Sequence, residues 1–238
     1  IIINAACEPE IAQLCEYLND MGANINGIGT MRLVIDGVDS LHSADVDIIP
    51  DRIEAGTFLT AGALLGEITL EDIIPQHLDL VLLKLREAGC GILTTTNSVT
   101  ISPADSIQPV DMTTAVYPGF PTDLQAQWVA LMSLAKGSSM ITDTVYHDRF
   151  SHVPELNRFG ANIKLENNTA FVPGVNELIG APVMSTDIRA SASLIVAGLA
   201  AKGTTEVSRI YHIDRGYEQI EEKFRSLGAN IQRKNSSA

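Results

Sequence analysis

A short phrase built around a glycine recurs four times along this chain of 238 residues. The copies read LNDMGANI, LREAGCGI, LNRFGANI and FRSLGANI, and their shared glycines are Gly22, Gly89, Gly160 and Gly228. Successive glycines lie 67, 71 and 68 residues apart, and a period of this size indicates one supersecondary unit copied several times. The sequence opens just before the last helix of a unit, so we expect the first copy to be only partly present.

The composition narrows the class of protein. Hydrophobic residues make up 45% of the chain and aromatic residues 5%, which predicts a sizeable, mainly aliphatic core. The formal net charge of −13 argues against binding to nucleic acid or to an anionic membrane. We recognise neither a bilayer-spanning run nor a secretory signal, so we expect a cytoplasmic protein. The cysteines and histidines lack ligand spacing and no nucleotide-cofactor motif occurs, so we expect neither a metal nor a cofactor.

A second element recurs three times, as DRIEAGTFLTAGALL from Asp51, DLQAQWVALMSLA from Asp123 and DIRASASLIVAGLAA from Asp187. Each segment is apolar or small on nearly every face, which predicts a helix that is buried on all sides. Each begins with an Asp, a residue suited to N-capping, and capping accounts for the three equally well. Each is expected to end at a glycine-led break, at Gly66, Gly137 and Gly203.

A β-rich stretch follows each of these segments, as EITLEDI, SSMITDTVY and TTEVSRIYHI. An amphipathic helix comes next, clearest over residues 217–228, where Ile220, Phe224 and Leu227 share one face. The recurring glycine then stands where a helix C′ residue needs a positive φ. Short strands close the unit, such as ANIKLE with TAFVPG and ANINGI with MRLVIDG.

These units predict an α/β architecture with pseudo-threefold repeats, in which the buried helices pack together and the sheets form the outer wall. Residues 1–49 are expected to be the remnant of a second domain. Residues 50–238 are expected to form a domain of three units, with the boundary at Ile49–Pro50. The polar tail Arg233–Ala238 is expected to fray.

Four arginines stand at unusual places. Arg52 and Arg189 fall in the first turn of buried helices, where a cation opposes the helix dipole, and Arg149 and Arg215 precede outer helices. One interpretation is that each arginine pairs with a neighbouring aspartate, namely Asp51, Asp187, Asp148 or Asp214. Because the arrangement recurs at equivalent places, the set favours a shared anion site, to which helix N-termini would contribute.

Long segments of the chain resemble a known family. They include NAACEPEI, PDRIEAGTFL, FPTDLQAQW, RFSHVPELNRFGA, TDIRASASLIVAGLAAKGTT and RIYHIDRGYEQIEEKFRSLGANI. From end to end the chain resembles the C-terminal part of bacterial UDP-N-acetylglucosamine enolpyruvyl transferases. The sister 5-enolpyruvylshikimate-3-phosphate synthases share the repeat fold and are less similar, because they carry a different stretch where this chain has HIDRGYE.

The resemblance implies an inside-out α/β barrel in two domains, N-terminally truncated here. It also implies a metal-free reaction in the cytoplasm, in which phosphoenolpyruvate gives its enolpyruvyl group to the 3-hydroxyl of UDP-N-acetylglucosamine and phosphate is released. This is the first committed step of peptidoglycan synthesis, and it proceeds by addition and elimination through a tetrahedral ketal.

The resemblance also implies roles for residues of the matching motifs. Asp123 would accept the proton of the sugar hydroxyl, and Asp187 would be a second active-site acid, involved in proton transfer to the methylene carbon. Three arginines would hold the carboxylate and phosphate of phosphoenolpyruvate: Arg149, Arg189 and the catalytic Arg215. Val145 would contact the uridine end and Thr122 would be its polar neighbour.

The family's mobile loop with its reactive cysteine would lie N-terminal to this chain, so the chain alone is expected to be inactive without that part. Two alternatives remain open. One is a non-catalytic homologue or fragment that binds nucleotide sugar, and the other is the shikimate-pathway enzyme. The combination of Asp123 and Asp187 with three arginines favours the transferase, because a pure binding module has no need for such an acid.

Overall fold

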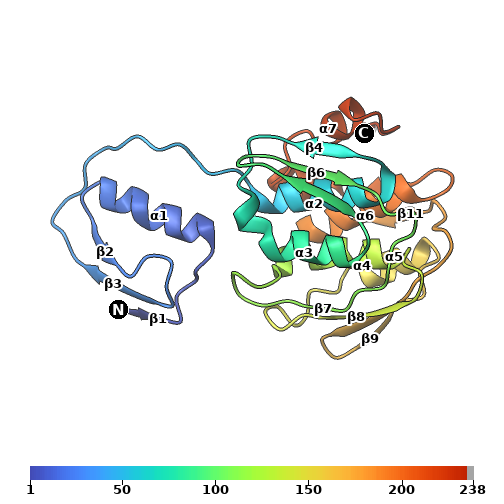
Figure 1. The fold of residues 1–238 in the computed structure, drawn as a ribbon, viewed down its shortest axis with the longest axis horizontal. Helices are drawn as coiled ribbons and strands as arrows, with labels where there is room; N and C mark the ends of the chain where they lie inside the picture. The colour runs from blue at the N-terminus through green and yellow to red at the C-terminus, as the bar shows by residue number, and fades with distance from the viewer. Residues whose placement is uncertain (235–238) are drawn as a thin grey trace.

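The computed structural model describes residues 1–234, which form a small lobe and a large one (Figure 1). Residues 1–36 build the small lobe, and residues from about 51 onward build the large one. Residues 37–50 connect them without helix or strand. The predicted domain boundary at Ile49–Pro50 stays a prediction.

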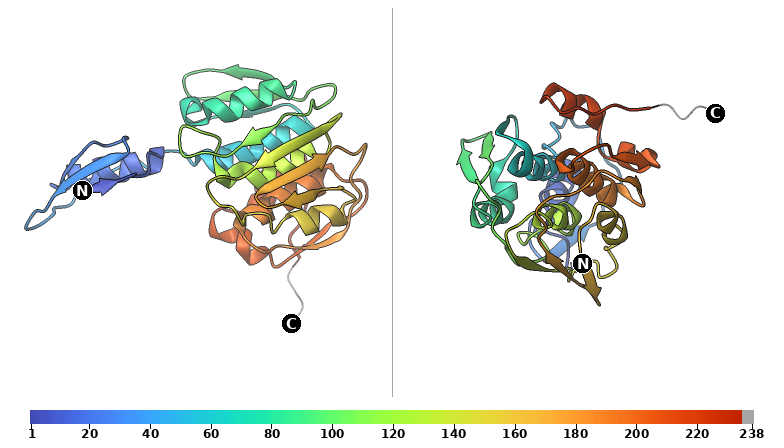
Figure 2. Two further views of the ribbon diagram at one scale, coloured as in Figure 1. Left: turned by 90° about the horizontal axis from the view of Figure 1, so that it is seen from below. Right: turned by 90° about the vertical axis from the view of Figure 1, so that its right-hand side faces the viewer.

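Three buried helices form the centre of the large lobe, as the sequence predicts. They are α2 (Arg52–Leu65), α4 (Gln125–Met132) and α6 (Ile188–Ala200), and each contacts the other two (Figure 2). All of α4 is buried, including Gln125 and Gln127, because neighbouring elements cover it on every side. The predicted glycine ends are right only for α2, which stops at Gly66. Helices α4 and α6 stop earlier, at Ser133 and Ala201.

The recurring glycine follows an outer helix in every copy, as predicted. The four helices are α1 (Pro9–Asp20), α3 (Asp79–Glu87), α5 (Val153–Arg158) and α7 (Ile220–Ser226). The glycines have φ values of 100°, 97°, 91° and 92°, which an L-residue with a side chain adopts only with strain. Helix α7 is shorter than predicted at its start, because Gln219 has left-handed backbone angles just before it.

Short sheets lie outside the central helices (Figures 1 and 2). Their strand orders are β4-β6-β5, β7-β8-β10-β9 and β11-β12. The first two sheets are antiparallel apart from the β7–β8 pair, and β11 and β12 are parallel. The strands are β4 (Ile68–Leu70), β5 (Gly91–Thr94), β6 (Val99–Ser102), β7 (Met112–Thr113), β8 (Ser138–Thr142), β9 (Lys164–Glu166), β10 (Thr169–Pro173), β11 (Pro182–Met184) and β12 (Glu206–Ser208).

The small lobe packs α1 against an antiparallel sheet of order β1-β3-β2, in which the strands are β1 (Ile2–Ile3), β2 (Asn24–Asn26) and β3 (Arg32–Asp36). Its core is small and contains Ala5, Cys15, Ile25 and Leu33. Many large apolar side chains of this lobe stay exposed, so the lobe has unpartnered surface.

Three short 3-10 helices complete the large lobe: η1 (Pro75–Leu78), η2 (Thr122–Leu124) and η3 (Ile210–Arg215). Arg215 therefore ends a 3-10 helix and does not start the next α-helix. The expected fraying of the tail is wrong for Arg233, whose guanidinium binds Asp214 and Glu221. Residues 235–238 of that tail lie outside the described residues.

Candidate functional site

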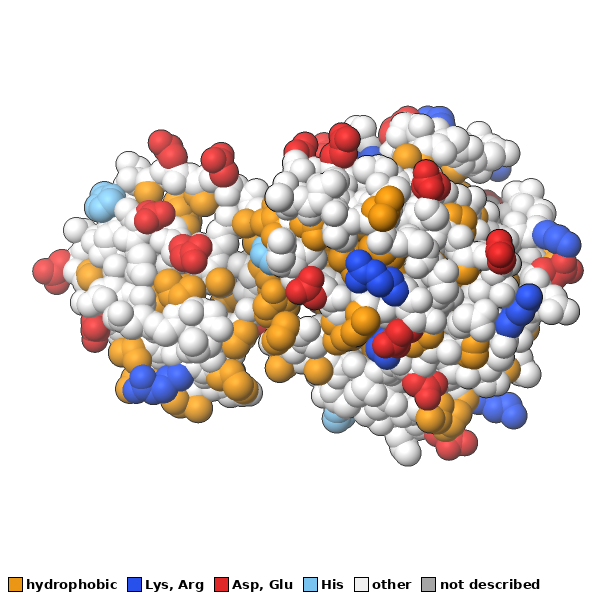
Figure 3. Space-filling view, in the orientation of Figure 1, with side chains coloured by type: hydrophobic (Ala, Val, Ile, Leu, Met, Phe, Trp, Pro, Cys, Tyr) orange, Lys and Arg blue, Asp and Glu red, His pale blue; other side chains and the backbone are white. Residues whose placement is uncertain are grey.

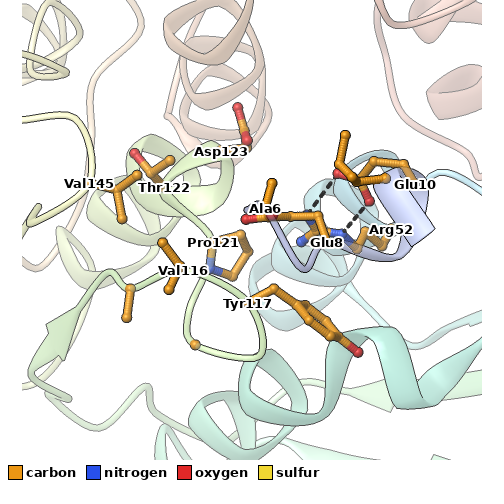
Figure 4. A pocket seen from close by; sticks show the side chains of 13 residues that line it. Ala6, Glu8, Glu10, Arg52, Val116, Tyr117, Pro121, Thr122, Asp123 and Val145 are labelled. Atoms are coloured by element: carbon orange, nitrogen blue, oxygen red, sulfur yellow. Dashed lines mark hydrogen bonds and ion pairs between the residues drawn. The ribbon is translucent and has the colours of Figure 1, made fainter. Parts of the chain in front are cut away.

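A pocket of about 300 Å³ lies where the two lobes meet (Figure 4). Residues at the start of α1 line one side, and the segment from Ala115 to Asp123 lines the other. Arg52 and Val145 complete the wall. The pocket therefore gathers the first turn of α2, the segment that leads into α4 and the turn after β8.

Asp123 joins two of the predicted arginines. Its Oδ1 atom accepts hydrogen bonds from Arg149 Nη1 at 2.8 Å and from Arg189 Nε at 2.9 Å. The Asp123 carboxylate does not cap a helix here, because it lies within η2, so capping is the wrong interpretation for Asp123. Pairing of Arg149 and Arg189 with their sequence neighbours Asp148 and Asp187 is also wrong.

The environment of Asp123 favours its ionised form. Burial raises the pKa of the carboxyl, but Arg189 and Arg149 outweigh burial and hold that pKa below its usual range. Desolvation likewise acts against the Arg189 cation, and Asp123 with the Tyr217 hydroxyl nevertheless raises the pKa of Arg189. The three side chains are 31%, 24% and 19% exposed for Asp123, Arg149 and Arg189, so a small solute can reach them.

Asp187 does cap its helix. Its Oδ1 atom accepts hydrogen bonds from the backbone N–H groups of Arg189 and Ala190, and its Oδ2 atom accepts one from Ser151 Oγ at 2.7 Å. Burial raises the pKa of Asp187, but these hydrogen bonds outweigh it and lower the pKa overall. Asp51 caps α2 in the same way, through Ile53 and Glu54.

Arg52 belongs to a different ion pair. Its Nε and Nη2 atoms donate to the two carboxylate oxygens of Glu10 at 3.2 and 3.0 Å, and its guanidinium lies over the Tyr117 ring at 5.7 Å. Pairing with Asp51 is therefore wrong. Figure 4 shows this pair at the side of the pocket that α1 provides, with Asp123 nearby.

Arg215 ends η3, which packs against α6, the helix that carries Arg189. Arg215 is exposed at the end of η3, and in residues 1–234 no hydrogen bond or ion pair joins it to Asp123, Asp187 or Arg189. Its neighbour Asp214 binds Arg233, so the expected Arg215–Asp214 pair is wrong. Arg149 and Arg189, which are joined through Asp123, are the two arginines of the predicted anion site that share a contact.

Thr122 and Val145 are held beside Asp123 by a residue that sequence reasoning missed. Asp143 is fully buried, and its carboxylate accepts hydrogen bonds from Thr122 Oγ1 at 2.6 Å and Thr114 Oγ1 at 2.7 Å. It also accepts from the backbone N–H groups of Val145 and Tyr146 at 3.0 and 2.8 Å. Asp143 thus ties η2 to the turn that leads to Arg149.

A second missed feature lies between the central helices. The buried Tyr217 hydroxyl is 2.8 Å from Thr57 Oγ1, and Gln127 Nε2 donates to the same threonine at 2.9 Å. Burial raises the pKa of Tyr217, so its phenol stays protonated. Tyr217 connects the segment after Arg215 to α2 and α4. Nothing in the surrounding HIDRGYEQ indicates that the Tyr217 hydroxyl is buried against α2 and α4.

Neither a metal centre nor a membrane span emerges from the described part of the chain. Within residues 1–234, no three His, Cys, Asp or Glu side chains are grouped to hold a metal ion. None of the helices in that range is long and apolar enough to cross a bilayer.

The family follows from comparison with known proteins. A model of the family "EPSP synthase (3-phosphoshikimate 1-carboxyvinyltransferase)" matches residues 1–224. The chain belongs to this family. Three curated relatives in it are the UDP-N-acetylglucosamine 1-carboxyvinyltransferases of Chlorobium chlorochromatii, Chloroherpeton thalassium and Nitratiruptor sp., which are 56%, 58% and 55% identical to this chain.

Each of these matches covers 98% of this chain but only 54–56% of the relative, so the chain spans about half the length of the family members it matches. Among solved structures, the enolpyruvyl transferase NikO from Streptomyces tendae is 31% identical, with a TM-score of 0.79 over 90% of this chain and 52% of that one. EPSP synthase from Acinetobacter baumannii shares the fold at 17% identity, with a TM-score of 0.62 over 79% of this chain and 45% of that one. The resemblance to enolpyruvyl transferases is confirmed.

Proposed function

We propose that this chain is the C-terminal part of an enzyme that transfers the enolpyruvyl group of phosphoenolpyruvate to the 3-hydroxyl of UDP-N-acetylglucosamine. The observation that carries the proposal is the position of Asp123 between Arg149 and Arg189 at the edge of the pocket. A carboxylate beside two guanidinium groups combines a proton acceptor with a site for an anionic substrate. Identities of 54–58% to relatives named for this reaction favour it over the shikimate-pathway reaction.

The reaction would have two steps. In the addition, the sugar oxygen bonds to C2 of phosphoenolpyruvate, its proton passes to Asp123, and the methylene carbon takes a proton with the help of Asp187. In the elimination, the methyl group of the resulting ketal loses a proton, the double bond forms again and phosphate leaves. Arg149, Arg189 and Arg215 would hold the carboxylate and phosphate, and guanidinium groups stabilise such anions bidentately.

Val145 and Thr122 would contact the nucleotide sugar. Val145 is partly exposed at the pocket wall, where an apolar side chain suits the uridine end of the substrate. Thr122 lies next to Asp123, and its hydroxyl donates to the Asp143 carboxylate at 2.6 Å.

Residues 1–49 would form part of a second domain, which the remaining half of the relatives' length would complete. The exposed apolar side chains of the small lobe support this, because unpartnered apolar surface marks sites of association. Figure 3 shows hydrophobic side chains along the lower edge of that lobe. The exposed apolar side chains of the small lobe include those of Ile1, Ile3, Met31 and Ile35. The complete enzyme would act in the cytoplasm at the start of peptidoglycan synthesis and would need no metal.

Phosphate release from phosphoenolpyruvate and UDP-N-acetylglucosamine tests the proposal. We expect no release by the chain alone, and release once it is mixed with or fused to the N-terminal portion of the Chlorobium relative that it does not match. Release with shikimate 3-phosphate in place of the nucleotide sugar would favour the sister reaction instead. Binding of nucleotide sugar without turnover in the fused protein would favour a non-catalytic binding protein.

A further inference from the structure

Asp123 lies between Arg149 and Arg189 and forms an ion pair with each. A single oxygen, Oδ1, receives hydrogen bonds from both Arg149 and Arg189, at 2.8 and 2.9 Å. We infer that Asp123 is an internal anion, which neutralises the arginine pair in the ligand-free protein and is displaced when an anionic group of the substrate binds. This inference rests on the proposed function of the same site.

The charged groups around Arg149 and Arg189 support displacement of Asp123 by a substrate anion. Asp187, the other acid nearby, is already engaged by two backbone N–H groups and Ser151, so Asp123 is the carboxylate that pairs with the guanidinium groups. All three members of the cluster are partly exposed, so an incoming phosphate or carboxylate can approach without unfolding the site. Ion pairs at this level of exposure are weak enough to be replaced by a better-matched anion.

The exchange would couple substrate binding to base strength. In the ligand-free protein the two arginines outweigh burial and keep the pKa of Asp123 low, which makes it a poor proton acceptor. When a substrate anion takes over the guanidinium groups, burial remains and the cationic partners are lost. The remaining burial and the loss of the cations both favour the protonated carboxyl, so Asp123 would become a better base when phosphoenolpyruvate is in place.

The competing explanation is that Asp123 forms a permanent structural ion pair with the arginines. The two explanations predict opposite changes in anion affinity when Asp123 is removed. If Asp123 only orders the arginines, its removal leaves them less well positioned and weakens anion binding. If Asp123 competes with the substrate anion, its removal uncovers the pair and strengthens anion binding. A variant that is catalytically impaired would then bind phosphoenolpyruvate more tightly.

Calorimetric titration of this chain with phosphoenolpyruvate, and separately with inorganic phosphate, distinguishes the two. We expect Asp123→Asn and Asp123→Ala to bind both anions roughly three- to tenfold more tightly than the unchanged chain, since two weak ion pairs no longer compete. Arg189→Ala should weaken binding in every background. Glu8→Gln is the matched control, because Glu8 lines the same pocket without bonding to either arginine, and it should change affinity less than twofold.

Equal or weaker binding by the folded Asp123 variants would overturn the inference, as would an absence of anion binding in all of them. An equal gain in Glu8→Gln would overturn it too, because a general charge effect would then suffice. The proposed function is judged separately, by phosphate release from the completed enzyme. If the completed enzyme turns over but the Asp123 variants show no gain in anion affinity, only the displacement of Asp123 is refuted and the proposed function stands.

Discussion

His152 is a buried histidine beside the candidate site. Its side chain is 1% exposed, and in residues 1–234 its Nε2 atom has no hydrogen-bond partner. Burial lowers the pKa of His152 to about 4, although the nearby Asp187 acts in the opposite direction. The imidazole is therefore neutral in the folded protein at pH values where an unfolded chain would already bind a proton.

This difference predicts a pH-dependent stability. An unfolded His titrates near 6.5 and His152 only at about 4, so the free energy of unfolding should fall as the pH drops from 6.5 towards 4. Between pH 6.5 and 5, urea unfolding should show a loss of roughly 1.5 kcal/mol from this group. Carboxyl groups contribute little there, because they titrate lower.

His152→Gln is the control for this prediction. The variant should lose most of the pH dependence and keep a smaller part from His77, whose pKa burial also lowers. An unchanged slope in His152→Gln would show that His152 is not the group responsible.

The sequence predicted which residue types gather at the site better than it predicted their roles. Asp51, Asp123 and Asp187 stand at equivalent places in the repeat, and only the structure separates two helix caps from one acceptor of arginines. Asp143 went unnoticed because nothing in SSMITDTVY marks it as buried. Burial of a loop carboxylate depends on the chain segments that fold over it, which a local pattern does not contain.

Among the helices, strands and turns, those with a strong local sequence pattern were predicted correctly. The glycines with positive φ and the three helices that are apolar all round follow from local sequence, and the structure confirms both. The strands β7 and β11 were not predicted. They contain two and three residues, and strands this short gain their order from the neighbouring strand they pair with rather than from their own sequence.

The segment from β8 to α5 depends on Asp143. Asp143→Ala would leave two hydroxyl groups and two backbone N–H groups without their acceptor, and it should lower the free energy of unfolding by roughly 3 kcal/mol. Asp143→Asn keeps the Oδ1 atom that accepts three of these four bonds, so the loss should be about 1 kcal/mol. Urea denaturation of both variants measures the difference. Equal losses would mean that the hydrogen bonds at Oδ1 contribute little.

In the whole molecule, side chains on one face of α1 link the small lobe to the connecting segment and to the large lobe. Glu10 binds the buried Arg52 at the start of α2. One turn along the helix, Gln13 Nε2 donates to the carbonyl of Asp47 at 2.7 Å and its Oε1 accepts from the N–H of Ile49. Glu10 thus connects α1 to the large lobe, and Gln13 connects α1 to the connecting segment.

Glu10→Gln should loosen this junction. The pair is half exposed on the Glu10 side, so its loss should cost about 1 kcal/mol and leave Arg52 without its counter-charge. Chymotrypsin cleavage at Leu41, in the connecting segment, should become about fivefold faster. Glu16→Gln, an exposed change on the same helix, should leave the rate unchanged. Equal rates in the two variants would show that the ion pair does not restrain the segment.

The capping of two central helices by Asp51 and Asp187, with Asp123 bonded to arginines instead, has an evolutionary consequence. The repeated unit places three carboxylates at equivalent positions of the sequence. Two of them stabilise a helix end, and α4 forms without a cap from the third. Redundancy within one chain thus lets selection act on chemistry at a single copy, while its sister copies preserve the framework.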